Sequence, residues 1–233
     1  MDKQYCTAIV LAGGSGKRMG TKIHKQYLLL GEKPVLYYSL RAFEDSELID
    51  EIILVTGSGE EDYCRKEIVE KYRLLKVKKI IPGGAQRYDS VWNGLQQTVE
   101  DGFVFIHDGA RPFVDQEMIR RGYECVCADR ACVAGIPAKD TIKIADADGF
   151  VVDTPDRSRV WIVQTPQVFE GALVKEAYRR LMEQEHSMVT DDAMAVEWTM
   201  KVPVRFFQGA YENIKITTPE DLETAEVFLK NRY

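Results

Sequence analysis

The chain has 233 residues, of which 45% are hydrophobic and 29% charged, and its formal net charge is −6. This length and composition are typical of one globular domain with a sizeable core. No segment approaches the ~20 consecutive apolar residues of a membrane helix, and residues 1–6 lack the basic and apolar regions of a signal peptide. A net-acidic chain also disfavours binding to duplex nucleic acid. We therefore expect a cytoplasmic protein with no membrane or nucleic-acid partner.

The cysteines indicate the same compartment. The chain has five, no two of them have C-x-x-C spacing, and no histidine lies close enough in sequence to complete a zinc-binding pattern. We interpret them as reduced thiols, which are usual in a cytoplasmic protein: Cys6, Cys64, Cys125, Cys127 and Cys132.

Short apolar runs alternate with segments of helical period, which is typical of an α/β fold. The pattern predicts strands at residues 7–11, 51–56, 77–81, 103–106, 132–137, 204–208 and 213–216. Because strands that alternate with helices usually pair in parallel, we expect an open, mostly parallel, Rossmann-like sheet flanked by helices.

Helix starts are marked at several places. Pro34 stands at one start, and apolar residues follow it at helical spacing. Asp115 is a candidate N-cap for another helix, and an apolar stripe marks a helix over residues 173–181. The sharpest start is Thr218-Pro219-Glu220-Asp221, where an N-cap Thr precedes Pro at the first helical position and an acid follows three residues after the cap. We expect this last helix to end at about residue 229.

One segment, residues 139–156, interrupts the alternation. Two short apolar runs, 141–144 and 151–154, flank an Asp-Gly turn at Asp148 and Gly149. Such a turn between short strands predicts a β-hairpin, and its few large apolar residues cannot cover both of its faces. We expect a single domain over residues 1–233 with this hairpin, called the arm below, projecting from the sheet.

The first predicted strand runs directly into the glycine-rich segment Ala12-Gly13-Gly14-Ser15-Gly16-Lys17-Arg18-Met19-Gly20. Ligands of open α/β sheets bind where strands end, and glycines let backbone N–H groups approach a phosphate. The segment does not match three known loop motifs. Arg18 stands where a P-loop has Ser or Thr, Met19 stands where a dinucleotide-binding fingerprint has Gly, and Ser15 is one residue out of place for a nucleophile elbow. A plain turn is the alternative, but it leaves the nearby cations without a role. We therefore interpret the segment as a phosphate-binding loop of another type.

Motifs along the rest of the chain resemble a known family. The glycine-rich segment and Lys25-Gln26-Tyr27 are similar to those of nucleotidylyltransferases, which activate sugar and polyol phosphates with a nucleoside triphosphate. Further motifs narrow the resemblance to the 2-C-methyl-D-erythritol 4-phosphate cytidylyltransferases of the non-mevalonate isoprenoid pathway, over about residues 7–230. These motifs are Gly83-Gly84-Ala85-Gln86-Arg87, His107-Asp108-Gly109-Ala110-Arg111-Pro112, Lys139-Asp140-Thr141-Ile142-Lys143, Asp156-Arg157, Gln164-Thr165-Pro166-Gln167, Thr190-Asp191-Asp192-Ala193 and Asn213-Ile214-Lys215-Ile216-Thr217.

The resemblance implies a reaction and the residues that carry it out. The phosphate of 2-C-methyl-D-erythritol 4-phosphate would attack the α-phosphorus of CTP in line and release pyrophosphate, with Mg²⁺ or another divalent cation on the triphosphate and no side-chain nucleophile. The implied catalytic residues are Arg18, Lys25, Arg157 and Lys215. The implied CTP-binding residues are Ala12, Gly13, Gly14, Gly16, Lys25, Gly84, Ser90 and Asp108. The implied substrate-binding residues are Asp108, Arg111, Thr141, Arg157, Thr165, Thr190 and Lys215. The family also forms a homodimer in which the arm helps complete the partner's site, and no protein ligand of the metal is identified.

Plainer interpretations of these residues stay open. Arg18, Lys25 and Lys215 fit solvated surface cations, and Ser90 fits a helix-cap serine. Arg111 fits a salt bridge within its own loop. Thr165 and Thr190 fit cap or turn hydroxyls. His107 is more simply interpreted as a residue that supports the end of a strand than as a member of a catalytic triad. Two rival functions also remain, a ribitol-5-phosphate cytidylyltransferase and a non-catalytic nucleotide-binding module.

Overall fold

The computed structural model describes residues 3–14, 24–183 and 188–232, and its centre is a seven-stranded sheet in the order β11-β7-β10-β6-β1-β4-β5. Neighbouring strands pair in parallel except β10, which is antiparallel to both β6 and β7. The predicted fold class, an open and mostly parallel sheet, is confirmed. The strands are β1 (Cys6–Ala12), β4 (Glu51–Thr56), β5 (Val77–Pro82), β6 (Phe103–Asp108), β7 (Ala131–Pro137), β10 (Trp161–Glu170) and β11 (Arg205–Gln208).

Strand prediction failed at two places. Residues 213–216 were expected to form a strand but form none. Asn213 N donates to Ala210 O (3.1 Å) and Ile214 N donates to Glu212 O (2.8 Å), so these backbone groups make hydrogen bonds within a turn and not with a neighbouring strand. The alternating isoleucines instead pack under the last helix. Conversely, β10 was not predicted, because Pro166 and the polar residues beside it are unusual in a central strand. The pairing with β7 shifts register between Val163 and Gln167, and this irregularity accommodates the proline.

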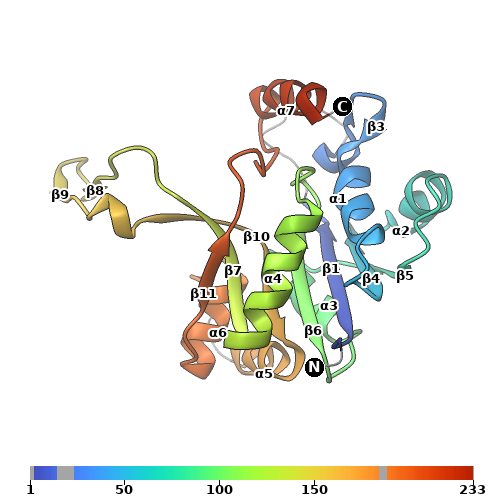
Figure 1. Ribbon diagram of the computed structural model, residues 1–233, viewed down its shortest axis with the longest axis horizontal. Coiled ribbons are helices and arrows are strands. Elements are labelled where there is room, and N and C mark those ends of the chain that lie inside the picture. Colours follow the sequence, from blue (N-terminus) through green and yellow to red (C-terminus); the bar gives the residue numbers. More distant parts are fainter. Residues whose placement is uncertain (1–2, 15–23, 184–187, 233) are drawn as a thin grey trace.

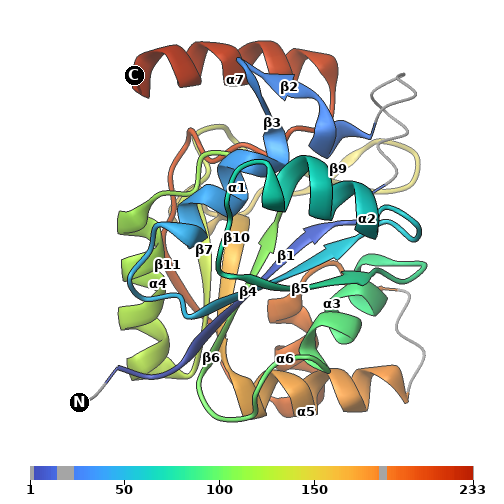
Figure 2. The same ribbon diagram turned by 90° about the vertical axis from the view of Figure 1, so that its right-hand side faces the viewer.

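Helices cover both faces of the sheet (Figures 1 and 2). Side chains of β1 alternate, with Ala8 and Val10 in one core cluster and Ile9 in the other. The first cluster includes residues of α1 (Val35–Glu44), of α4 (Gln116–Asp129) and of the π-helix η3 (Cys64–Glu70), which continues the short α2 (Glu61–Tyr63). The second cluster packs against α3 (Arg87–Leu95), α5 (Gly171–Met182) and α6 (Asp192–Met200).

The last helix, α7 (Pro219–Arg232), forms a separate small core with Leu30, Val35, Phe113 and Ile216. Its predicted start is confirmed: Thr218 N donates to Asp221 Oδ2 (2.9 Å), and Asp221 N donates to Thr218 Oγ1 (3.4 Å). The predicted N-cap of α4 is also confirmed, since Asp115 Oδ1 accepts from Met118 N (2.7 Å). Nearby lie the short hairpin β2 (Leu29–Leu30) and β3 (Lys33–Pro34) and the 3₁₀ turn η2 (Lys25–Tyr27).

The arm forms the predicted hairpin, in which β8 (Ile144–Ala145) and β9 (Val151–Asp153) pair apart from the central sheet, followed by the 3₁₀ turn η4 (Arg157–Arg159). Figure 1 shows the arm projecting sideways from the body. The turn contains Gly149 at φ 88, a conformation that glycine adopts without strain. Within the described ranges, no helix is both long enough and apolar enough to cross a membrane.

Candidate active site

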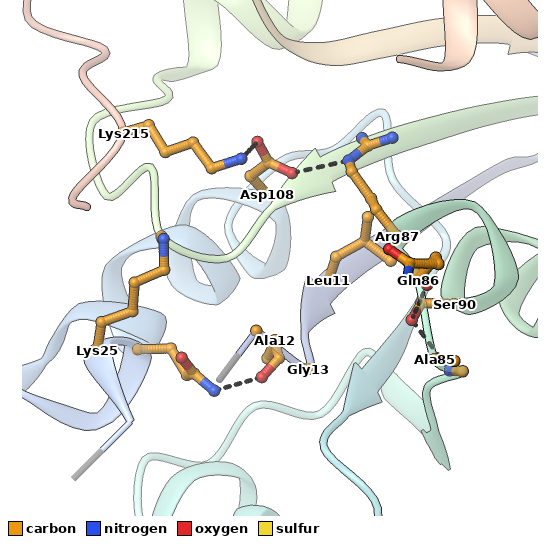
Figure 3. Close-up of a pocket in the computed structure, with 14 residues that line it drawn as sticks. Leu11, Ala12, Gly13, Lys25, Ala85, Gln86, Arg87, Ser90, Asp108 and Lys215 are labelled. Atoms are coloured by element: carbon orange, nitrogen blue, oxygen red, sulfur yellow. Dashed lines mark hydrogen bonds and ion pairs between the residues drawn. The ribbon is translucent and has the colours of Figure 1, made fainter. Parts of the chain in front are cut away.

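The carboxyl ends of four parallel strands meet in one row. The register pairs Ala12 of β1 with Thr56 of β4, Thr56 with Pro82 of β5, and Leu11 with Asp108 of β6. A cavity of ≈ 360 Å³ opens at this edge (Figure 3). It is lined by Leu11, Ala12, Gly13, Gly14, Lys25, Gln26, Gly84, Ala85, Gln86, Arg87, Ser90, Asp108, Ala110 and Lys215. Most of the proposed CTP-binding residues therefore surround one cavity, while Gly16 and Arg18 lie outside the described residues.

Glycine is required where two strand ends meet the cavity. A Cβ on Gly13 would lie 3.1 Å from the carbonyl oxygen of Thr56, and a Cβ on Gly83 would lie 2.7 Å from Ser90 Oγ. A side chain at either position would displace the neighbouring group, Thr56 or Ser90, from the end of its strand or loop. The two glycine segments thus allow backbone groups of both loops to face the same ligand.

Ser90 ties the second of these loops together. Its hydroxyl donates to Gln86 O and accepts from Gly84 N, each at 3.1 Å. It is not the helix cap, because the side chains of Gln86 and Asp89 form the capping box of α3. Ser90 therefore shapes the turn at Gly84 directly beside the cavity.

Lys25 is positioned by the short turn η2. Its Nζ donates to Ile216 O (2.9 Å), and the neighbouring Gln26 Nε2 donates to Ala12 O (2.5 Å). Gln26 is buried and fixes the turn to the end of β1. Segment 213–217, although not a strand, thus helps to hold this lysine in the cavity (Figure 3).

Asp108 is the electrostatic centre of the site. Its carboxylate lies 2.8 Å from Lys215 Nζ, 3.3 Å from Arg87 Nε and 3.7 Å from Arg111 Nε. Burial alone would raise the pKa of Asp108, but the three cations hold that pKa well below its usual range. The carboxylate therefore stays ionised, and Lys215 is ion-paired rather than merely solvated (Figure 3).

Arg87 belongs to the motif Gly83-Gly84-Ala85-Gln86-Arg87 but was not among the residues to which the resemblance assigned a role, and it lines both cavities. Its Nη1 and Nη2 each lie 2.8 Å from the carboxylate of Asp192, which is fully buried. Tyr178 Oη donates to the same carboxylate (2.5 Å). Burial would lower the pKa of Arg87, but Asp192 and Asp108 raise it well above its usual value. The only sequence signals were the arginine after Gly83-Gly84 and the paired acids at 191–192.

A second cavity of ≈ 290 Å³ shares Arg87, Asp108 and Lys215 with the first. Its lining includes five of the seven proposed substrate residues, Asp108, Arg111, Thr165, Thr190 and Lys215. These residues come from β6 and the loop after it, from β10, from the segment before α6 and from the segment before α7. Their convergence brings most of the proposed substrate residues to one cavity next to the first.

Thr165, which lines this second cavity, forms a structural link with the fully buried His107. Burial lowers the pKa of His107 to about 4, so its ring is neutral at pH 7. Its Nε2 lies 3.1 Å from the carbonyl of Arg111, which only accepts, so Nδ1 accepts from the Thr165 hydroxyl (3.1 Å). That hydroxyl also accepts from Asp108 N (3.1 Å). The prediction that His107 supports a strand end agrees with these contacts, and Thr165 aligns β10 with β6.

The salt bridge considered for Arg111 is present, while its substrate-binding role stays a prediction. It pairs with Asp108, and its Nη1 donates to Asn213 O (2.7 Å), which connects the loop after β6 to segment 213–217. It also lines the second cavity.

Thr141 and Arg157 do not line either cavity of their own chain. Both are exposed, Thr141 on the arm and Arg157 directly after it, and Arg157 Nη1 donates to Lys139 O (3.1 Å), which joins the two ends of the hairpin. The chain by itself does not bring these two proposed residues to the others.

No group of three or more His, Cys, Asp or Glu side chains among the described residues is arranged to hold a metal ion. Asp108 is the only carboxylate among the described residues that line the first cavity. Such a site fits a Mg²⁺ ion held mostly by phosphates and water, because this ion commonly takes only one or two protein carboxylates.

Known proteins share this architecture. The chain matches the family model of 2-C-methyl-D-erythritol 4-phosphate cytidylyltransferase over residues 6–231. It is 56% identical to the enzyme of that name from Lachnospira eligens, over 96% of this chain and 99% of the relative, and 48% identical to that from Lachnoclostridium phytofermentans, over 96% of each chain. A crystal structure of 4-diphosphocytidyl-2C-methyl-D-erythritol synthase from Anaerococcus prevotii has a TM-score of 0.86 and 34% identity, covering 98% of this chain and 97% of the other. The chain therefore belongs to the 2-C-methyl-D-erythritol 4-phosphate cytidylyltransferase family, the nucleotidyltransferases of the non-mevalonate isoprenoid pathway.

Proposed function

We propose that this chain joins CTP and 2-C-methyl-D-erythritol 4-phosphate to give CDP-methylerythritol and pyrophosphate. The observation that carries the proposal is the meeting of two adjoining cavities at Asp108, Arg87 and Lys215, with Lys25 in the first cavity. Two anionic ligands can bind side by side there. The family and the relatives named for this reaction support the choice of substrates.

CTP occupies the first cavity in this proposal. The turn at Gly84, held by Ser90, reads the cytosine through backbone groups, and the glycine-rich segment after β1 lies along the triphosphate. Lys25 lies at the α-phosphate and stabilises the charge that builds up on the five-coordinate phosphorus. Arg18 is proposed to share this task.

The polyol phosphate occupies the second cavity. Lys215 and Arg111 attract its phosphate, and Thr190 with Asp108 orients its hydroxyl groups. An oxygen of this phosphate forms a bond to the α-phosphorus of CTP while the bond from that phosphorus to the bridging oxygen breaks, and pyrophosphate leaves. No side chain has to act as a nucleophile, so positioning and cationic stabilisation supply the catalysis.

A divalent cation, Mg²⁺ by preference, is proposed to enter with CTP. When bound, it would neutralise charge on the triphosphate, and Asp108 is the protein carboxylate placed to contact it or its water. The ionised state of Asp108, which its three cationic neighbours maintain, suits this role.

We further propose that residues 1–233 form a single domain and that the arm docks on a second copy of the chain. The arm leaves large apolar side chains exposed, among them Phe150 (73%), Val152 (61%) and Val151 (59%), and a projecting hairpin cannot bury them by itself. Docking would also take Thr141 and Arg157 to the partner's second cavity. The homodimer then has two sites, each built from two chains. The cysteines are all free thiols, which suits the proposed cytoplasmic location.

Release of pyrophosphate from CTP tests the proposal. We expect turnover with 2-C-methyl-D-erythritol 4-phosphate and Mg²⁺, little turnover with ribitol 5-phosphate, and none when UTP or ATP replaces CTP. Turnover with ribitol 5-phosphate alone would overturn the choice of substrate. An absence of turnover with both polyol phosphates would instead favour a non-catalytic nucleotide-binding module.

A further inference from the structure

Glu60 lies outside both cavities, yet its carboxylate contacts the turn that carries Lys25. Glu60 follows β4 and immediately precedes α2. Its Oε2 accepts from Tyr27 Oη (2.8 Å) and from Gly57 N (3.1 Å), and its Oε1 lies 2.5 Å from His24 Nδ1. One carboxylate thus connects the loop after β4 to both ends of the stretch from His24 to Tyr27.

Tyr27 is well fixed at its end of this connection. Its ring packs edge-on against Tyr63 with centroids 4.9 Å apart, and its Oη lies 3.1 Å from Cys64 Sγ. Burial first of all, then the neighbouring Cys64 and Glu60, raises the pKa of Tyr27. The phenol therefore stays protonated and donates a hydrogen bond to Glu60.

The two residues between these ends face the active site. Gln26 is fixed to Ala12 at the end of β1, and Lys25 Nζ donates to Ile216 O. Lysine loses much rotamer freedom when its ammonium group is held in one place. A backbone that is fixed on both sides of Lys25 lowers the entropic cost of holding the ammonium group in one place. That place matters, because a displacement of about 1 Å from the reacting geometry can lower the rate about 100-fold.

We propose that Glu60 is a positioning residue for Lys25: by holding His24 and Tyr27 against the loop after β4, it sets the place of the Lys25 ammonium group in the cavity. This inference rests on the proposed function of Lys25 at the α-phosphate. It assigns to the β4–α2 loop, which contributes nothing to the cavity lining, a part in the rate of phosphoryl transfer.

The first test is a double-mutant cycle. We expect Glu60→Ala to lower kcat about 10- to 100-fold with little change in KM for the polyol phosphate. In a Lys25→Ala background the same change is expected to cost less than about twofold, because a residue that acts through Lys25 has nothing left to position. Equal effects in both backgrounds, or wild-type kcat in a folded Glu60→Ala protein, would overturn the inference.

Conservative and control variants complete the design. Glu60→Gln keeps an oxygen that accepts from Tyr27 and Gly57 and changes only the partly exposed contact with His24, so its kcat is expected to fall by no more than about threefold. Asp62→Ala removes an exposed carboxylate of α2 and is expected to be neutral. If Glu60→Ala does not fold, Tyr27→Phe replaces it, with a loss of about 3- to 10-fold expected for one hydrogen bond and the same dependence on Lys25.

Hydrogen exchange separates this inference from the proposed function. Backbone amides of residues 25–28 are expected to exchange faster in Glu60→Ala than in the wild type or in Asp62→Ala. Unchanged exchange rates would contradict the proposal that Glu60 holds this turn in place. This measurement needs no substrate, so it remains decisive even if the wild-type protein shows no cytidylyltransferase activity, a result that would count against the proposed function alone.

Discussion

Lys25 is the residue proposed to act at the α-phosphate of CTP, and its side chain lines the first cavity. Its ammonium group already lies in the first cavity, where a transferred phosphorus would need positive charge. We expect Lys25→Ala to lower kcat by about 100-fold or more while the thermal midpoint changes little, because the lysine belongs to none of the three hydrophobic core clusters. Steady-state kinetics and a melting curve check this. Lys78→Ala, an exposed lysine on β5, is the matched control, and near-normal activity of Lys25→Ala would remove it from its proposed role.

His107 gives the molecule a pH dependence in its stability. Burial lowers its folded-state pKa to about 4, whereas the pKa of an unfolded histidine is about 6.5. Above pH 6.5 the His107 ring is neutral in both the folded and the unfolded chain. Between pH 6.5 and pH 4 only the unfolded chain takes up the proton, so stability falls as the pH is lowered, by about 2 kcal/mol at pH 5.

Urea unfolding at pH 7.5 and at pH 5 measures this dependence. We expect the difference between the two pH values to shrink by about 2 kcal/mol in His107→Gln, whose amide can keep one donor and one acceptor. The depressed pKa of Asp108 keeps that carboxylate ionised over this range, so it does not contribute to the difference. An unchanged difference in His107→Gln would show that other groups cause the pH dependence.

At the scale of elements, the arm determines whether a site is built from one chain or two. Arg157 is exposed directly after the arm and lines neither cavity of its own chain. If it serves the partner, Arg157→Ala and Lys25→Ala protomers should complement each other, because one site of a mixed dimer has both intact residues. Random assembly of equal amounts predicts about a quarter of wild-type activity.

Coexpression of the two variants, followed by the pyrophosphate assay, tests this complementation. Each variant alone is expected to be nearly inactive. A mixture of Lys25→Ala with Lys215→Ala provides the matched control, because both residues line one cavity of the same chain and a mixed dimer then has no intact site. Activity of the coexpressed pair no higher than that of this control would mean that Arg157 acts in its own chain or not at all.

The whole molecule is acidic, with a net charge of −6, yet Lys25, Arg87, Arg111 and Lys215 gather at the two cavities beside Asp108. These cations come from four separate parts of the chain. Net charge therefore does not give the sign of the ligand. The proposed binding of anions depends on this local concentration of cations, which the fold produces.

The oligomeric state also belongs to this scale. The mass of one chain is 26.6 kDa, and we expect light scattering to give twice this value. Phe150→Asp with Val152→Asp places charges on the exposed apolar face of the arm and is expected to give monomers with a native circular dichroism spectrum and little activity. A wild-type monomer with full activity would contradict the two-chain site.

Several features were determined by sequence alone because their causes are local. Asp115 and Thr218 begin helices since their side chains accept from backbone groups three residues ahead. An Asp-Gly turn closes the arm at Gly149. The phosphate site that the glycine-rich segment predicts has a local signal of the same kind, its composition and its place directly after an apolar strand, and stays a prediction. Each signal depends on neighbours within a few residues, so it can be read without the positions of distant parts of the chain.

Other features were decided only by tertiary structure. Residues 161–170 become a central antiparallel strand because β6 and β7 leave a place between them, and an irregular register accommodates Pro166. Residues 213–216 have the alternation of a strand, but their isoleucines pack under α7 instead. Likewise, nothing local to Asp108 shows that Arg87 and Lys215 neutralise it, or that Glu60 holds the turn of Lys25. These contacts join residues far apart in the chain, and only the folded sheet sets the distances between them.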